Sequence, residues 1–191
     1  MMGGVKGKMS QCVRPIPPDA ENSQMYKIDC PITEREVSRL NEFVQRVDVP
    51  DGAFMRIEID SPGGNLASAF AMCDILRPWH SKIETVNVGR VDSAAIAIYS
   101  MGSRRVAVQG SSFSFHPVTK MVQGTADVDF ARRLLSELEH DQEEFVNAVA
   151  RRTGIDHGRI QEMMQRCCHV SASQSLEIGL STEVIGMNGG H

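Results

Sequence analysis

Residues 55–64 read MRIEIDSPGG, and this stretch decides the fold. Its apolar residues Met55, Ile57 and Ile59 occupy every second position, which is the period of a β-strand. Pro62 then restricts the backbone, and the two glycines after it allow the chain to pass very close to a ligand. The pattern predicts a strand that is buried on one face and ends in a tight turn.

The sequence after this turn alternates between helical and extended patterns. It predicts a helix at about 66–76, a strand at 83–88, a turn led by Gly89, and an apolar helix at 93–101. Strands that alternate with helices favour an α/β fold with a largely parallel sheet and right-handed crossovers. Ligands bind at the carboxyl ends of such strands, so we expect both glycine-containing turns to lie at the functional edge of the sheet.

The flanking sequence predicts further elements of the same domain. A strand at 25–28 precedes an amphipathic helix that Thr33 and Glu36 could open as a capping box. Downstream we expect strands at 105–108 and 112–115, a long helix at about 126–152 that Gly154 ends, a helix near 157–166, and a small helix capped by Ser171. One domain is therefore expected over residues 25–186, between a flexible N-terminal tail at 1–24 and a C-terminal tail at 187–191.

The amino-acid composition excludes several classes of protein. The chain has 191 residues and a mass of 21.0 kDa, with 41% hydrophobic and 23% charged residues, as in an ordinary globular domain. A net charge of -4 and a pI near 5.9 argue against a nucleic-acid partner. The five cysteines are odd in number and irregularly spaced, which argues against a disulfide framework. No apolar run approaches the ~20 residues of a membrane span, so we expect no membrane partner and a cytoplasmic location.

Two side chains could carry chemistry at the predicted edge of the sheet. Ser93 follows a strand and opens a helix, where its hydroxyl would meet a ligand and the backbone N–H of Ala94 would be free for an oxyanion. A serine at this position is more often a simple N-cap. His116 follows the apolar strand 112–115 and could be a general base or a histidine of the core.

Four motifs together resemble the proteolytic subunit of the Clp protease, over about residues 25–186. They are DSPGG at 60–64, GRVDSAA at 89–95, FHP at 115–117, and the stretch from SA at 171–172 to GL at 179–180. Each motif alone is weak, but their order and spacing are specific. The resemblance implies the ClpP/crotonase-like fold, which is a spiral of ββα units with a long handle helix, and the activity of a serine endopeptidase that needs no cofactor.

The resemblance also implies roles for individual residues. Ser93 matches the nucleophile, His116 the general base, and the backbone N–H groups of Gly64 and Ala94 the oxyanion hole. Cys167 stands where the family has its triad aspartate, so the third triad position is degenerate. Cys167, Cys168 and His169 lack the spacing of a metal site, and no metal is expected. In the family, peptide substrate adds as a strand between segments that correspond here to 65–68 and 118–123.

Partners and the orientation of His116 remain open at this stage. The resemblance implies a peptide or unfolded protein substrate and a homo-oligomeric ring that pairs through the handle helix. An AAA+ ATPase partner is left undecided, because residues 1–24 do not resemble the family's docking segment. With Cys167 in place of the aspartate, His116 could be oriented by Glu162, Asp92, a backbone carbonyl or water.

Four functions compete. The first is a serine endopeptidase that forms an acyl-enzyme at Ser93, and the second is a weak or inactive ring subunit, which the cysteine at the aspartate position favours. The third is an acyl-CoA enzyme of the crotonase kind, against which the order of Ser93 and His116 argues. The fourth is a Ser-Lys peptidase with Lys82 or Lys120 as its base.

Overall fold

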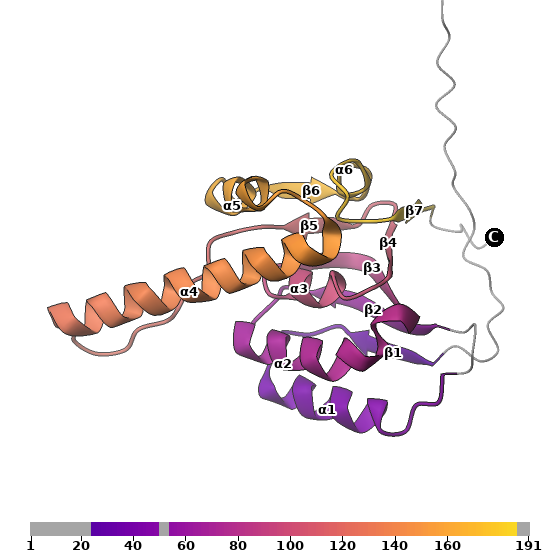
Figure 1. Cartoon of the computed structure of the whole chain (residues 1–191), viewed down its shortest axis with the longest axis horizontal. Coiled ribbons are helices and arrows are strands. Elements are labelled where there is room, and N and C mark those ends of the chain that lie inside the picture. Colours follow the sequence, from indigo (N-terminus) through magenta and orange to yellow (C-terminus); the bar gives the residue numbers. More distant parts are fainter. Residues whose placement is uncertain (1–23, 50–53, 187–191) are drawn as a thin grey trace, which may run out of the picture.

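The computed structural model describes residues 24–49 and 54–186, which form the expected α/β fold (Figure 1). The strands are β1 (Met25–Ile28), β2 (Met55–Ser61), β3 (Ile83–Asp92), β4 (Arg104–Val108), β5 (Ser112–Ser114), β6 (His169–Ser171) and β7 (Glu183–Ile185). The helices are α1 (Glu34–Val44), α2 (Leu66–Leu76), the 3-10 helix η1 (Arg77–Lys82), α3 (Ala95–Tyr99), α4 (Val128–Thr153), α5 (His157–Gln165) and α6 (Ala172–Glu177). Apart from Gln24, the tails predicted at 1–24 and 187–191 lie outside the described residues.

The sheet is largely parallel, as the alternation of strands and helices predicts. Its main path runs β1-β2-β3-β4-β7, and every pair along it is parallel. Met55, Ile57 and Ile59 of β2 are fully buried, while the residues between them are partly exposed. The carboxyl end of β2 therefore carries the PGG turn to the edge where β3 also ends.

Strand β3 is longer than the sequence predicts, and the turn expected at Gly89 is wrong. The first half of β3 pairs with β4 and its second half with β5, so two successive partners keep the strand extended through Gly89 to Asp92. A Cβ at Gly89 would lie 2.7 Å from the carboxyl carbon of Asp60. Glycine is thus needed here for close approach to β2, where the register shifts after Ile59, and not for a turn.

Helix α3 lies in the core immediately after the end of β3. All five of its residues are fully buried, and it packs against α2 and β3. The hydroxyl groups of its last residue, Tyr99, and of Ser181 lie 2.8 Å apart and form a hydrogen bond. The helix is shorter than the predicted 93–101, because Ser93 and Ala94 form a turn and Ser100 already ends it.

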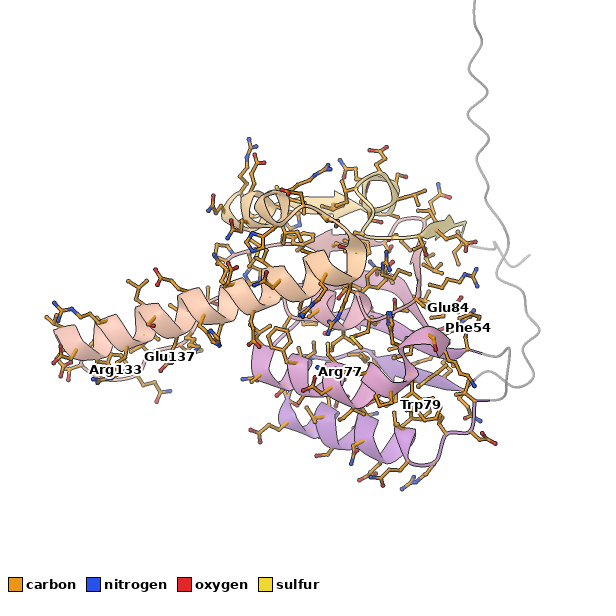
Figure 2. The ribbon with its side chains drawn as sticks, in the orientation of Figure 1. Phe54, Arg77, Trp79, Glu84, Arg133 and Glu137 are labelled. Carbon is orange, nitrogen blue, oxygen red and sulfur yellow. The ribbon has the colours of Figure 1, made fainter. Side chains whose placement is uncertain are left out.

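Helix α4 projects from the body of the molecule (Figure 1). Asp127 accepts a hydrogen bond from the Phe130 amide at its start, and Gly154 ends it with a left-handed φ of 78°. Its buried residues lie between Phe145 and Val149, in the C-terminal half of the helix. The N-terminal half extends into solvent, and Figure 2 shows Arg133 and Glu137 on that half.

Local details correct the sequence-based expectations in two places. Thr33 stands at the N-cap of α1 but its side chain makes no capping hydrogen bond, and Glu36 pairs with Arg39 at 3.0 Å instead. The capping box appears at α6, where Ser171 and Gln174 bond each other's backbone amides. Strands β6 and β7 are missing from the prediction because three residues are too few to show a period of two. No helix of the described residues is long and apolar enough to cross a membrane.

Candidate active site

Ser93 lies in a strained turn between β3 and α3. Its φ is 54°, in the left-handed region, where an L-residue costs about 1–2 kcal/mol. Backbone hydrogen bonds hold the turn on both sides: the Ser93 amide donates to the Ser114 carbonyl at 2.9 Å, and the Ile96 amide donates to the Ser93 carbonyl at 2.9 Å. A strained residue that is fixed in this way is typical of functional sites.

The PGG turn of β2 packs directly against the Ser93 turn. A Cβ at Gly63 would lie 2.5 Å from the Asp92 carbonyl oxygen and 2.9 Å from the Ser93 Cβ. A Cβ at Gly64 would lie 2.4 Å from the carbonyl oxygen of Ile32. Both glycines also have positive φ, at 83° and 148°. The absence of a side chain at Gly63 lets the PGG turn approach the Ser93 turn, and its absence at Gly64 lets the same turn approach the backbone of Ile32.

Two backbone amides beside Ser93 are left without acceptors. The amide of Ile32 donates to the Gly63 carbonyl at 2.8 Å, and the amide of Asn65 donates to the Ile32 carbonyl at 2.9 Å. This pairing leaves the N–H of Gly64 unused, and within residues 54–186 the N–H of Ala94 has no acceptor either. Both residues line the same cleft as Ser93. Two such donors can stabilise an anionic oxygen.

The cleft has a volume of about 540 Å³ and contains every site residue that the sequence predicts except Cys167. Phe145 of α4 and Met164 of α5 form part of its wall and are 4% and 2% exposed. The remaining lining residues come from the PGG turn, the start of α2, the turn between β3 and α3, the segment after β5, and α4. They are Pro62, Gly64, Asn65, Leu66, Ala67, Ser93, Ala94, Phe115, His116, Val118, Thr119, Lys120 and Asp141.

His116 is half-buried and is held by the backbone of its neighbour. Its Nδ1 lies 2.8 Å from the carbonyl oxygen of Pro117. Because a carbonyl oxygen only accepts, Nδ1 must carry the proton, and Nε2 is left with the lone pair of a base. Ser93 and His116 line one cleft, although in the described structure no hydrogen bond joins their side chains.

The pairing of β5 with β6 ends one residue short of His116 and Cys167. Ser114 pairs with His169 in this antiparallel ladder, and the Phe115 amide donates to the Cys168 carbonyl at 2.9 Å. Cys167 is the next residue beyond this hydrogen bond and lies in the turn between α5 and β6. Cys167 is exposed, has a φ of 50°, and makes no side-chain hydrogen bond within the described chain.

Comparison with known proteins now identifies the family. The family model described as Clp protease matches residues 48–188. The chain belongs to the Clp protease family. It is 30% identical over 131 residues to the ATP-dependent Clp protease proteolytic subunit 2 of Treponema denticola, an alignment that covers 67% of this chain and 64% of the relative. The proteolytic subunit of Dehalococcoides mccartyi is 30% identical over 146 residues, or 75% of this chain and 70% of the relative.

A solved structure confirms the fold of this Clp-family chain. A ClpP1 mutant from Listeria monocytogenes superposes with a TM-score of 0.75 at 18% identity, covering 86% of this chain and 92% of that one. The predicted ClpP/crotonase-like fold is therefore correct. In sequence, the chain aligns with only 64% of the length of the first two relatives, from Treponema denticola and Treponema pallidum.

The carboxylates considered for orienting His116 do not contact it. Glu162 is exposed and pairs with Arg166 at 2.8 Å. The Oδ1 atom of Asp92 is buried and has no hydrogen-bond partner in the described residues. Of the groups that the sequence leaves open, the backbone carbonyl is the one that meets the ring, and it belongs to Pro117.

The two lysines considered as alternative bases are unsuited to that role. Lys120 lines the cleft, but its Nζ lies 2.9 Å from Asp141 and 3.1 Å from Glu137. The hydrogen bond to Asp141, and then that to Glu137, raise the pKa of Lys120, so it stays protonated. Lys82 precedes β3 and donates to the Val49 carbonyl at 3.1 Å, and the ten residues of β3, about 30 Å of strand, separate it from Ser93.

The substrate-binding segments differ from the expectation. The segment at 65–68 is helical from Leu66 onward, with Asn65 as the N-cap, so most of it cannot pair with an added strand. The segment at 118–123 contains neither helix nor strand, and its first residues line the cleft. Sequence reasoning missed Asp141, Phe145 and Met164 of the cleft wall, because they come from distant helices and carry no local motif.

Proposed function

We propose that this chain is a serine endopeptidase of the Clp type, with Ser93 as nucleophile and His116 as general base. The observation that carries the proposal is the cleft in which a strained serine, a histidine with a free Nε2, and the unpaired amides of Gly64 and Ala94 come together. Nucleophile, base and oxyanion donors are the parts that acyl transfer requires. None of these parts needs a cofactor.

The proposed reaction follows from these positions. The Ser93 Oγ attacks the peptide carbonyl carbon while its proton passes to the His116 Nε2. The amides of Gly64 and Ala94 donate to the oxyanion of the tetrahedral intermediate. When the intermediate collapses, the C–N bond breaks and His116 returns the proton to the leaving amine. Water then attacks the acyl-enzyme, with His116 again accepting a proton, and releases the acid product and free Ser93.

The Pro117 carbonyl supports only part of what a triad aspartate does. A carbonyl dipole can fix the tautomer and direction of the ring, but it lacks the full negative charge that stabilises an imidazolium. We therefore propose slow turnover relative to a complete triad. The second candidate, an inactive ring subunit, is favoured by one observation, which is the exposed thiol of Cys167 at the position where the resemblance implies an aspartate.

The wall of the cleft supports a peptide substrate with an apolar side chain next to the scissile bond. Phe145 and Met164 are buried at the cleft and Leu66 is half-buried there, so an apolar side chain would be removed from water against them. The irregular segment at 118–123 offers backbone groups to an extended peptide, which favours loose sequence preference. Peptides and unfolded protein segments fit both features.

The projecting half of α4 supports a homo-oligomeric assembly. Val128 and Leu135 on this half are 66% and 56% exposed, and Met121 in the adjoining segment is 94% exposed. Large apolar side chains on a helix that extends from the body are typical of protein–protein contacts. We propose that α4 packs against another copy of the chain, as the handle helix of the family implies.

The test is labelling with a fluorophosphonate probe, together with hydrolysis of a fluorogenic peptide. Wild type should be labelled on Ser93, and both Ser93→Ala and His116→Ala should lose labelling and hydrolysis. Ser173→Ala is the matched control, since Ser173 is an exposed serine on α6 that lies outside the cleft. Sedimentation velocity should establish that each variant has the same oligomeric state as wild type.

The outcomes separate the competing functions. Labelling that persists in Ser93→Ala would refute Ser93 as nucleophile. Neither labelling nor hydrolysis in a correctly assembled wild type would establish the inactive subunit. An acyl-CoA enzyme would turn over a thioester substrate without needing the Ser93 hydroxyl, and that activity would survive in Ser93→Ala.

A further inference from the structure

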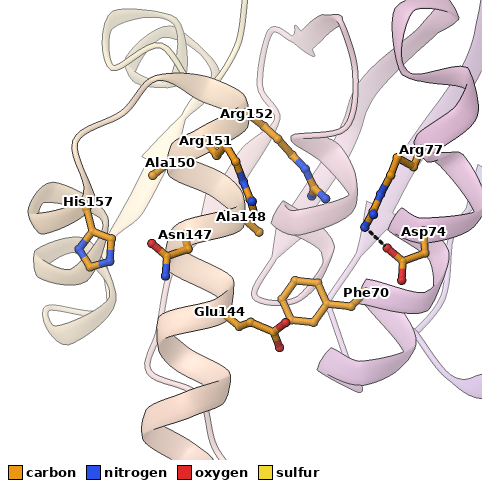
Figure 3. A pocket seen from close by; sticks show the side chains of 10 residues that line it. All are labelled: Phe70, Asp74, Arg77, Glu144, Asn147, Ala148, Ala150, Arg151, Arg152 and His157. Atoms are coloured by element: carbon orange, nitrogen blue, oxygen red, sulfur yellow. Dashed lines mark hydrogen bonds and ion pairs between the residues drawn. The ribbon is translucent and has the colours of Figure 1, made fainter.

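A second cavity of about 570 Å³ lies between α2 and the C-terminal half of α4 (Figure 3). It shares no lining residue with the cleft around Ser93. Its volume is in the range of small-molecule sites, roughly 300–1,000 Å³. Phe70 and Ala148 supply apolar surface, and the remaining lining is mostly charged. The cavity is therefore a candidate binding site that is separate from the cleft.

Three arginines line this cavity, and the structure neutralises only one of them with a carboxylate. Arg77 pairs with Asp74 on the α2 side. Arg151 is exposed and has no ion pair or side-chain hydrogen bond in the described residues. Arg152 bonds only neutral atoms, as described below. Figure 3 shows the side chain of Arg152 extending from α4 toward Arg77, with the side chain of Arg151 lying along α4 beside it.

Arg152 is fixed in place by one edge of its guanidinium group. Its Nη1 donates to the Ala97 carbonyl at 3.1 Å, to the Ser100 Oγ at 3.4 Å and to the Cys73 Sγ at 3.5 Å. Its Nε and Nη2 have no acceptor among the described residues. A guanidinium that is held by neutral partners keeps its full charge, and its unused donors suit the oxygen atoms of a carboxylate or phosphate.

Two acidic side chains line the cavity, and neither pairs with Arg151 or Arg152 in the described residues, while Asp74 is already paired with Arg77. Glu144 is seven residues before Arg151 on α4, about 10 Å along the helix axis, and it lies beside Phe70 (Figure 3). His157 is already paired with Glu143 at 2.9 Å. An anion is therefore attracted to the Arg151–Arg152 end and repelled from the Glu144 end.

We propose that the cavity binds a small free anion with two or more negative charges, of the phosphate or dicarboxylate class, between Arg151 and Arg152. The site is independent of the peptidase chemistry proposed above. Two uncompensated guanidinium groups call for more than one negative charge, and the concave shape favours a small molecule over a flat protein surface. Phe70 and Ala148 can cover an apolar part of the ligand.

The test is isothermal titration calorimetry of the full chain with two probes, inorganic pyrophosphate and succinate, at constant ionic strength. Wild type should bind at least one of them with one site per chain. Arg151→Gln should weaken binding by about tenfold or more, because a charge-assisted hydrogen bond is lost. Arg133→Gln removes the same charge from the projecting end of α4 (Figure 2) and should bind like wild type.

Arg152 requires a more conservative substitution, because its side chain also forms hydrogen bonds with the end of α3. Arg152→Lys keeps the charge but loses the planar fork, and it should weaken binding with an unchanged melting temperature and circular dichroism spectrum. Equal weakening in Arg151→Gln and Arg133→Gln would overturn the proposal, since it would show general attraction to a positive surface. So would the absence of binding of either probe at millimolar concentration.

The negative charge could also come from an acidic side chain of a second copy. In that case wild type would bind neither probe, and Arg151→Gln would change the sedimentation coefficient of the assembly. That result would overturn the free-anion site.

Discussion

Ser93 and Cys167 have almost the same backbone strain in opposite surroundings. They are the two non-glycine residues of the described chain with positive φ, at 54° and 50°. Ser93 lies between the core helix α3 and the packed PGG turn, whereas Cys167 lies in an exposed turn between α5 and β6. The amides of Cys167 and Cys168 bond the Met164 and Met163 carbonyls at 3.1 and 3.0 Å, and the Phe115 amide bonds the Cys168 carbonyl at 2.9 Å, so backbone hydrogen bonds hold the second turn.

The difference teaches how each turn contributes to a site. At Ser93, packing from three separate elements leaves the strained conformation no alternative, so the hydroxyl keeps a fixed direction. At Cys167 the neighbouring side chains impose no such constraint. The first turn can therefore hold a nucleophile in a fixed direction, while the second presents an exposed thiol.

The largest expected effect comes from Gly63→Ala, which disrupts the packing between the PGG turn and the Ser93 turn. The new Cβ would meet the Asp92 carbonyl oxygen at 2.5 Å, and alanine would have to adopt a φ of 83°. Together the steric overlap and the left-handed backbone should lower the free energy of unfolding by about 2–5 kcal/mol. Chemical denaturation measures the loss, and peptide hydrolysis should fall to background in the fraction that remains folded.

Gly110→Ala is the matched control for that change. Gly110 has a φ of 93°, but nothing lies within 4 Å of the position of its Cβ. Its variant should lose only the backbone contribution of about 1–2 kcal/mol and keep its hydrolytic activity. Equal destabilisation by the two variants would show that the contact between the turns contributes nothing.

The next effect concerns the Cys167 turn, where Cys167→Asp introduces a carboxylate at the position that the resemblance assigns to the triad aspartate. We expect kcat/KM for peptide hydrolysis to rise by about tenfold or more, since loss of the aspartate in another serine protease lowers kcat by roughly 10⁴-fold. Steady-state kinetics on equal amounts of assembled protein measure the change.

Cys168→Ser serves as the control, because it alters the neighbouring thiol without adding charge. It should leave kcat/KM close to that of wild type. An unchanged rate in Cys167→Asp would mean that the Pro117 carbonyl already orients His116 fully, and a rise in both variants would point to the thiols themselves as the defect.

The sequence predicts the fold well where a pattern is local. Strand β2 and helix α2 agree closely with their predicted bounds, because β2 is buried on one face and the helix begins after the PGG turn and ends just before Pro78. The prediction fails at Gly89, where only the change of partner from β4 to β5 keeps β3 extended. Which strand pairs with each half of β3 depends on the assembled sheet, so the residues of β3 alone do not indicate it.

The candidate site likewise has some features that the local sequence predicts and others that it does not. Ser93, His116, Gly64 and Ala94 could be picked out because each follows a strand end, and the structure places all four at one cleft. The hydrogen bond from His116 to the Pro117 carbonyl depends on a backbone torsion that no residue type dictates. The helical start at Leu66, which removes the edge for an added strand, depends in turn on the cap that Asn65 provides.

The smallest expected effect is a change in the free energy of unfolding. The variants Cys167→Gly and Ser93→Gly compare the two turns directly. Glycine relieves the left-handed strain of about 1–2 kcal/mol but costs about 0.5–1 kcal/mol of chain entropy, so Cys167→Gly should gain at most about 1 kcal/mol. Ser93→Gly should gain less, because the Ser93 Cβ packs against Gly63 and its loss leaves a gap in the wall between the turns. Thermal unfolding measures both changes on the same protein background. If the two variants gained the same stability, packing would not be what holds Ser93 in its left-handed conformation. The two turns would then differ only in the chemistry of their side chains.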